Sequence, residues 1–153
     1  MRKRSLLNAL LILGMSPVLL GMSGCGMITY TLRHGFSTPP ASEFGLGPRT
    51  SAGGRYVATI DTASKLVTGK LQMIRLTVKD STGAAVTGAS ITVDGGMPQH
   101  GHGLPTHPRV TAEEPNGVYV VDGLKFNMGG WWELRFTITT TEGAETVTFN
   151  VRL

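Results

Sequence analysis

The sequence predicts an all-β domain, an immunoglobulin-like antiparallel β-sandwich of about seven strands, in roughly its last 100 residues. Two observations predict it. Apolar and polar side chains alternate with a period of two in the clearest segments, as in strands that bury one face. Short candidate strands follow one another at spacings of about 8 to 15 residues with glycine-rich turns between them, and no segment has the periodicity of an amphipathic helix.

The first half of this domain contains three candidate strands. We expect strands over residues 55–61, 71–80 and 89–94. The second is the clearest, because Ile74, Leu76 and Val78 share one face and polar residues share the other. The segment 80–83, Asp-Ser-Thr-Gly, has the composition of a turn.

The second half continues the pattern to the last residues. Short strands are expected over 109–113, 118–121 and 124–126, and Asn116-Gly117 supplies a turn before the second of them. Two longer alternating segments follow, separated by a turn at Glu142-Gly143. Their inward residues are Trp132, Leu134, Phe136 and Ile138 in the first and Val147, Phe149 and Val151 in the second.

The N-terminus has the organisation of an export signal. Three cations at positions 2–4 precede a mostly apolar, uncharged run over 6–20, which is too short and too interrupted to span a bilayer comfortably. Small residues then lead to Cys25, the only cysteine, in a pattern that resembles a bacterial lipobox. We therefore expect a lipoprotein signal peptide over 1–24 and a membrane anchor through a lipid on Cys25.

The mature chain then begins with a linker. Residues 25–53 contain the lipidated cysteine and Pro-, Gly- and Ser-rich stretches, and the sandwich domain is expected over 54–153. Removing the signal lowers the formal net charge from +4 to about +1, so nucleic acid binding is not expected. The protein is expected to be exported and to face the periplasm or the cell exterior, with the outer membrane favoured because Gly26 rather than Asp follows the cysteine.

One loop contains most of the residues that could carry chemistry. Residues 95–108 hold three of the four histidines, next to Met97. Because residues i and i+2 of an extended backbone point to the same side, His100 and His102 could direct two imidazoles at one ion. Pro98 disfavours a helix and so favours this extended conformation. Solvated loop histidines are the alternative, and His107 is either a third ligand or a bystander.

The ligand types favour copper. Imidazole suits several transition metals, and a thioether adds a preference for Cu(I) over Cu(II). Met97 lies three residues before His100, and Met128 lies in a loop that a sandwich could bring to the same end; each is otherwise a packing residue. The histidine cluster contains no carboxylate, which disfavours a catalytic zinc or non-haem iron site.

Catalytic signatures are missing from the sequence. It has no nucleophile elbow, no phosphate-binding glycine loop and no His-Glu-x-x-His motif, and no small-molecule substrate is evident. Trp132 is expected to be buried, whereas Trp131 points to the other face and could cover the histidine loop or a partner surface. We expect a protein that is not an enzyme.

The linked order of these motifs resembles the YtkA-like domains, which are related to FixH-type proteins and similar in build to CopC-type copper carriers. The resemblance covers roughly 54–153 and rests on Met97-Pro98-Gln99-His100-Gly101-His102-Gly103 followed by Met128-Gly129-Gly130-Trp131-Trp132. It implies an exported immunoglobulin-like sandwich with a role in copper handling, and Met97, His100, His102 and Met128 as ligands. Members often have Pro where Gly129 stands here.

These expectations combine into one leading hypothesis. It is a non-enzymatic copper-binding lipoprotein that stores copper or delivers it to another envelope copper protein. The alternative is an immunoglobulin-like interaction module that binds another envelope protein without a metal. A small-ligand carrier that uses Trp131 is a third reading.

Overall fold

A computed structural model describes residues 37–153 of the 153-residue chain. The expected signal peptide over 1–24, the lipidation site Cys25 and the first part of the linker lie outside the described residues. The described part is all-β, with a single three-residue 3₁₀ helix, η1 (Ala41–Glu43). No helix within residues 37–153 combines the length and the apolar character needed to cross a membrane.

The described part contains seven strands of six residues or more and two of two residues each. All pairs between these strands are antiparallel. The expected all-β antiparallel sandwich is therefore confirmed. The strands are β1 (Arg49–Thr50), β2 (Tyr56–Asp61), β3 (Leu71–Asp80), β4 (Ser90–Met97), β5 (His102–Gly103), β6 (Arg109–Glu114), β7 (Val118–Lys125), β8 (Trp131–Thr140) and β9 (Gly143–Arg152).

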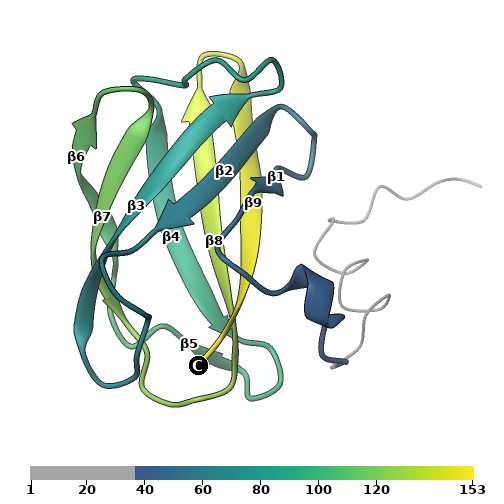
Figure 1. The fold of residues 1–153 in the computed structure, drawn as a ribbon, viewed down its shortest axis with the longest axis vertical. Helices are drawn as coiled ribbons and strands as arrows, with labels where there is room; N and C mark the ends of the chain where they lie inside the picture. The colour runs from purple at the N-terminus through teal and green to yellow at the C-terminus, as the bar shows by residue number, and fades with distance from the viewer. Residues whose placement is uncertain (1–36) are drawn as a thin grey trace, which may run out of the picture. The chain divides into compact units, whose positions relative to one another are not determined.

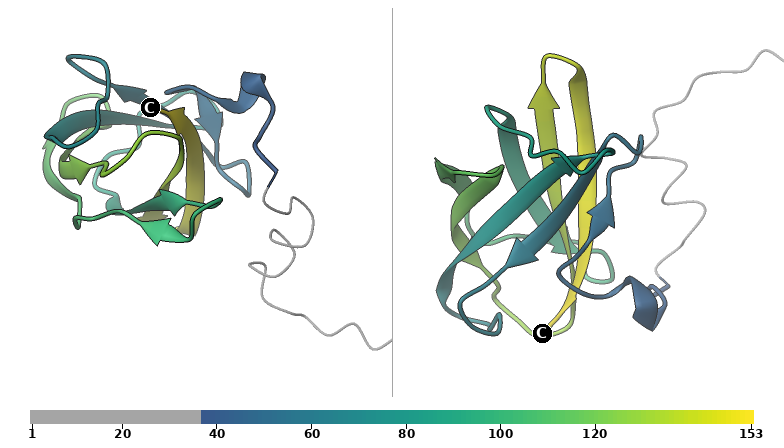
Figure 2. Two further views of the ribbon diagram at one scale, coloured as in Figure 1. Left: turned by 90° about the horizontal axis from the view of Figure 1, so that it is seen from below. Right: turned by 45° about the horizontal axis from the view of Figure 1, so that its top comes forward.

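The strands form two layers. The strand order is β1-β2-β3-β7-β6-β4-β8-β9, and β5 pairs with β4 beside this path. β2 and β3 cross in front of β8 and β9 in Figure 1, and the turned views in Figure 2 show the same two layers. A single residue pair, Thr92 with Arg109, joins β4 to β6 where one layer passes into the other.

The core lies between the layers and is built by the expected alternation. In β8 the side chains of Trp132, Leu134, Phe136 and Ile138 are fully buried, and Val147 and Phe149 of β9 oppose them. Aromatic rings meet edge to face inside the core: Phe126 against Trp132, with ring centroids 5.2 Å apart, and Phe136 against Phe149, at 5.7 Å. Period-two sequence patterns thus identify the buried face of each long strand.

The expected turns form with the expected chemistry. The Asp80 carboxylate accepts hydrogen bonds from the backbone N–H groups of Thr82 and Ala84, and Gly83 has a φ of 91°. Asn116 and Gly117 both have positive φ, which is the backbone that an Asn-Gly turn adopts. One expectation was wrong: residues 118–121 and 124–126 are not two short strands, because β7 runs without a break from Val118 to Lys125.

The sheet begins before residue 54, where the sequence placed the start of the domain. Strand β1 pairs with β2, Phe44 forms a bridge with Asn150 of β9, and the Ile60 N–H donates to the Leu46 carbonyl. The latter part of the expected linker therefore packs on both layers. Its glycines and prolines resemble a flexible linker in composition, yet they form specific backbone pairs here.

Candidate metal centre

The candidate ligands lie at one end of the sandwich, which we call the loop end. It consists of the loops over residues 62–70, 98–101 and 126–130 together with Leu153, at the bottom of Figure 1. The Gly69 N–H donates to the Phe126 carbonyl, and Gly130 and Leu153 exchange two backbone hydrogen bonds. Three segments that are distant in sequence are thereby fixed beside one another.

The histidine motif forms a tight hairpin, which we call the His hairpin (residues 97–103). Its turn is not extended, contrary to the expectation from Pro98. The backbone N–H groups of His100 and Gly101 both donate to the Met97 carbonyl, at 3.0 and 2.9 Å. Pro98 occupies the position of such a turn that proline favours, and Gly101 has the positive φ of 65° that closes it. His100 thus lies in the turn and His102 on the returning strand.

Two glycines of β4 allow close approaches of neighbouring backbone. A Cβ atom on Gly96 would lie 2.5 Å from the His102 carbonyl oxygen of the hairpin, and one on Gly95 would lie 2.6 Å from the Glu133 carbonyl oxygen of β8. Neither contact can be relieved by rotating a side chain, because both neighbours are backbone atoms. Gly96 is therefore the sequence signal for β5 folding back on β4, and Gly95 is the signal for the close approach of β4 to β8.

The two imidazoles do come together, although by the hairpin rather than by an extended strand. The ring centroids of His100 and His102 are 6.2 Å apart, and the ring planes differ by 15°. Two rings that share an ion have centroids at most about 6.4 Å apart, because each nitrogen lies about 2.0 Å from the ion and about 1.2 Å from its ring centre. Both histidines are exposed, so their rings can rotate toward a common ion.

Met97 is the first residue of the His hairpin, and its side chain belongs to the core. It pairs with His102 in the register of β4 and β5, and paired residues of antiparallel strands project their side chains to the same face about 5 Å apart. The side chain is only 2% exposed, and its methyl carbon lies 2.8 Å from the position that a Cβ on Gly130 would take. The Met97 side chain is therefore a packing group of the core on the strand that pairs with His102.

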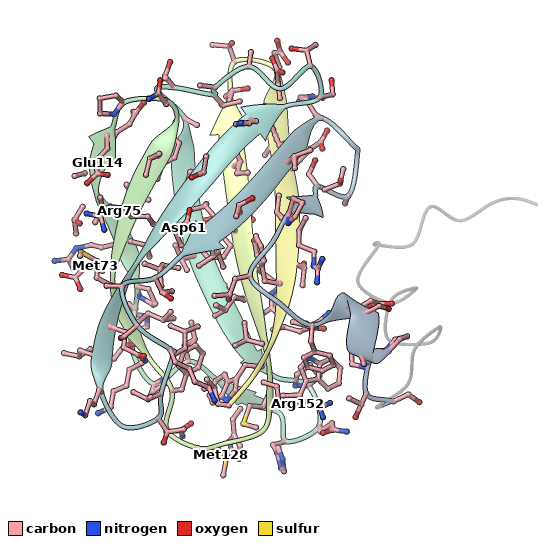
Figure 3. All side chains as sticks on the ribbon, in the orientation of Figure 1. Asp61, Met73, Arg75, Glu114, Met128 and Arg152 are labelled. Atoms are coloured by element: carbon pink, nitrogen blue, oxygen red, sulfur yellow. The ribbon has the colours of Figure 1, made fainter. Side chains whose placement is uncertain are left out.

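Met128 is the exposed thioether of the same end. Its side chain projects outward from the loop between β7 and β8, as Figure 3 shows, and is 39% exposed. The Met128 carbonyl accepts the Trp132 indole N–H at 3.1 Å, which fixes the backbone of the loop. Through Gly130 the same loop contacts Met97. Met97 thus packs against the loop that carries Met128, while the Met128 side chain itself is exposed.

His107 lies in a different environment. It lines a small hollow of about 100 Å³ with Arg109 and Asp122, in the chain between β5 and β7. Within residues 37–153, no three His, Cys, Asp or Glu side chains approach closely enough to hold one metal ion. A site at the His hairpin would therefore use two imidazoles and sulfur rather than three imidazoles.

The nearby carboxylates are already paired. On the outer face of β4 and β8, Arg135 binds Asp94 at 2.6 Å and Glu133 at 3.2 Å. The guanidinium of Arg135 lowers the pKa of the Asp94 carboxyl below its ordinary value, although partial burial acts in the opposite direction. Both carboxylates therefore serve the sheet surface and compete poorly as ligands for a cation at the hairpin.

Trp131 does not cover the His hairpin. It is 7% exposed on the outer face of β8, where Phe44 packs against it with ring centroids 6.5 Å apart. Its indole N–H donates to the Asn150 side-chain oxygen at 2.8 Å. Arg152 also contacts Phe44: its guanidinium carbon lies 4.5 Å from the centre of the Phe44 ring. The N-terminal segment thus covers an aromatic side chain that sequence analysis left open as a partner surface.

The comparisons with known proteins agree with the sequence resemblance. Neither curated proteins nor solved structures give a match. The family model described as YtkA-like matches residues 50–137, which is more than half of the chain and contains both the His hairpin and Met128. The matched region also begins at β1 rather than at residue 54. The chain therefore belongs to the YtkA-like family.

Proposed function

We propose that this protein is a non-enzymatic copper-binding lipoprotein that stores copper or delivers it to another copper protein of the cell envelope. His100 and His102 anchor the ion, and Met97 or Met128 adds a sulfur ligand. The observation that carries the proposal is the pairing of the two imidazoles, whose ring centroids lie 6.2 Å apart with nearly parallel planes, on a hairpin that closes against Gly96. Histidines that only face solvent do not require their two rings to lie this close together.

The donor set favours Cu(I). Two imidazole nitrogens and a thioether form a soft set without a carboxylate, and thioether ligands select Cu(I) among the common biological metals. Zinc sites more often use four ligands or include a carboxylate or a third imidazole. The exposed hairpin leaves the ion accessible from one side. An open coordination position of this kind permits transfer to a partner.

The proposed location follows from the sequence of the N-terminus. A lipid on Cys25 would attach the mature chain to a membrane surface, with the outer membrane favoured, and the folded domain would face the periplasm or the cell exterior. Copper exchange between proteins attached to or embedded in the same membrane is then a two-dimensional search. Attachment raises the effective concentration of the two partners.

A titration of residues 26–153 tests copper binding. This segment lacks only the signal and the lipidated cysteine, and it contains every residue of the described core. We expect about one Cu(I) per chain in competition with a chromophoric chelator, and a large loss of affinity in the His100→Ala/His102→Ala variant. His107→Ala is the matched control, because this exposed histidine lies outside the hairpin.

Two results would contradict the proposal. The first is a double variant that binds copper as tightly as the unchanged chain, which would show that the hairpin is not the site. The second is an unchanged chain that binds no copper but captures a partner equally well in the presence of chelators, which would show that the domain is a metal-independent interaction module.

A further inference from the structure

The loop end also exposes apolar side chains that the proposed copper site does not use. Four large apolar side chains are exposed within residues 37–153, and three of them, Val67, Leu71 and Met128, belong to this end or its border. Leu71 is 67% exposed and Val67 is 41% exposed. Large apolar groups gathered at one end of a small domain mark a contact surface.

The loop that carries Val67 and Leu71 is held in one conformation. The Gln72 side chain accepts a hydrogen bond from the Val67 N–H and donates one to the Val67 carbonyl, each at 2.8 Å. The Gly69 N–H donates to the Phe126 carbonyl at 2.7 Å, which attaches the loop to its neighbour. These hydrogen bonds hold the backbone in a conformation that leaves the side chains of Val67 and Leu71 exposed.

Cations surround these apolar groups. Lys65 and Lys70 are exposed in the same loop, and Lys125 pairs with Leu71 in the register of β3 and β7. Within residues 37–153 no lysine takes part in an ion pair, whereas Arg55, Arg75 and Arg135 all do. The three lysines are therefore available to an external anion.

Several acidic side chains lie toward the opposite end of the sandwich. Strand β3 runs from Leu71 to Asp80, a distance of about 30 Å for ten residues. Asp80 ends β3 and Glu142 lies in the turn between β8 and β9 at the far end, and Glu114 lies on the left side of the molecule in Figure 3, above its middle. The lysines without an ion pair at the loop end therefore lie beside the exposed apolar side chains, away from Asp80 and Glu142.

We propose that the loop end docks on an anionic phospholipid surface. Val67 and Leu71 would enter the headgroup region while Lys65, Lys70 and Lys125 contact lipid phosphates. Protruding apolar side chains with lysines beside them fit a bilayer, which offers anionic headgroups above an apolar layer. Docking in this way would bring the His hairpin to the membrane surface, but it does not depend on copper.

Vesicle sedimentation with metal-free residues 26–153 tests the proposal. Without the lipid on Cys25, any binding must come from the protein surface, and without copper the result is independent of the proposed function. We expect sedimentation with vesicles of phosphatidylethanolamine and phosphatidylglycerol, little with pure phosphatidylcholine, and weakening by added salt. Lys65→Gln/Lys70→Gln should lower the affinity about fivefold for each lysine, and Leu71→Gln should lower it about tenfold.

Lys79→Gln is the matched control. It changes an exposed lysine of β3 at the other end of the strand and should leave vesicle binding unchanged. Circular dichroism should show that all these exposed variants remain folded. Equal losses in Lys79→Gln and the double lysine variant would overturn the proposal. Lack of any binding to the anionic vesicles would also overturn it.

Discussion

Gly96→Ala should displace the His hairpin with little other change to the molecule. The new methyl carbon would lie 2.5 Å from the His102 carbonyl oxygen, and ordinary contact begins at 3.4 Å. The β5 backbone must therefore retreat by about 0.9 Å. β5 contains only two residues, so the hairpin moves more easily than the long strands β4 and β8.

The magnitude follows from the tolerance of metal sites. Ligand distances hold within about 0.2 Å, so a backbone displacement of about 0.9 Å at His102 exceeds the tolerance. Disturbing the groups that orient ligands costs about 10- to 100-fold in metal affinity. We expect a loss of Cu(I) affinity in that range. Overpacking should lower the free energy of unfolding by about 1–3 kcal/mol.

Gly103→Ala is the matched control, because Gly103 pairs with Gly96 across the same hairpin. A Cβ on Gly103 would meet only the Gly95 carbonyl oxygen at 3.8 Å, which is ordinary contact. Chelator competition gives the Cu(I) affinity, and thermal unfolding followed by circular dichroism gives the stability. The reasoning is refuted if Gly96→Ala binds Cu(I) normally with an unchanged Tm, or if Gly103→Ala loses as much as Gly96→Ala.

Three further predictions concern the sulfur ligands, the N-terminal segment and pH. Met97→Leu/Met128→Leu should weaken Cu(I) binding about tenfold with a stability cost below about 1.5 kcal/mol for the buried position; unchanged affinity in a chelator competition would make both methionines packing residues only. Phe44→Ala should lower the free energy of unfolding by about 1–2 kcal/mol in a urea titration, because the ring loses its contacts with Trp131 and Arg152; an unchanged midpoint would show that the segment does not stabilise the sandwich. The hydrogen bond from Ser51 holds the pKa of Glu145 below its ordinary value, so this carboxylate stabilises the fold above about pH 4.3 and the contribution is lost as pH falls through the lowered pKa. Glu145→Gln should therefore flatten the acid limb of a stability profile, and a limb as steep as that of the unchanged protein would exclude this role.

The strands could be predicted from the sequence because apolar and polar side chains alternate along the clearest of them. The alternation in 71–80 and 132–138 follows directly from the pleat, and the structure places β3 and β8 over those residues. Turn residues such as Asn116 and Gly117 were equally readable, because few residues adopt positive φ. Rules about single strands and turns were sufficient wherever the conformation depends only on neighbouring residues in the sequence.

The expected linker was misread because its pairing is not local. Residues 49–50 pair with β2, and Phe44 contacts β9, more than 100 positions further along the chain. Glycine and proline composition is shared by flexible linkers and by irregular segments that pack closely. Only the position of the partner strands distinguishes the two, and composition does not contain it.

The sequence indicated that the rings of His100 and His102 lie close together, but the extended backbone from which this was inferred is not the conformation of the loop. An extended backbone would have directed both imidazoles to one side, and the tight turn with Gly101 does so by another path. Trp131 shows the converse: its outward direction was predicted, but the aromatic ring that covers it comes from a distant segment. Spacing identified which residues meet, and tertiary packing determined how.

The metal content of the full-length protein, purified from the membranes of the cells that make it, tests the central claim most directly. Elemental analysis should find about one copper ion per chain, and this copper should be missing from the His100→Ala/His102→Ala variant purified in parallel. Zinc in place of copper, no metal at all, or copper retained by the double variant would contradict the account.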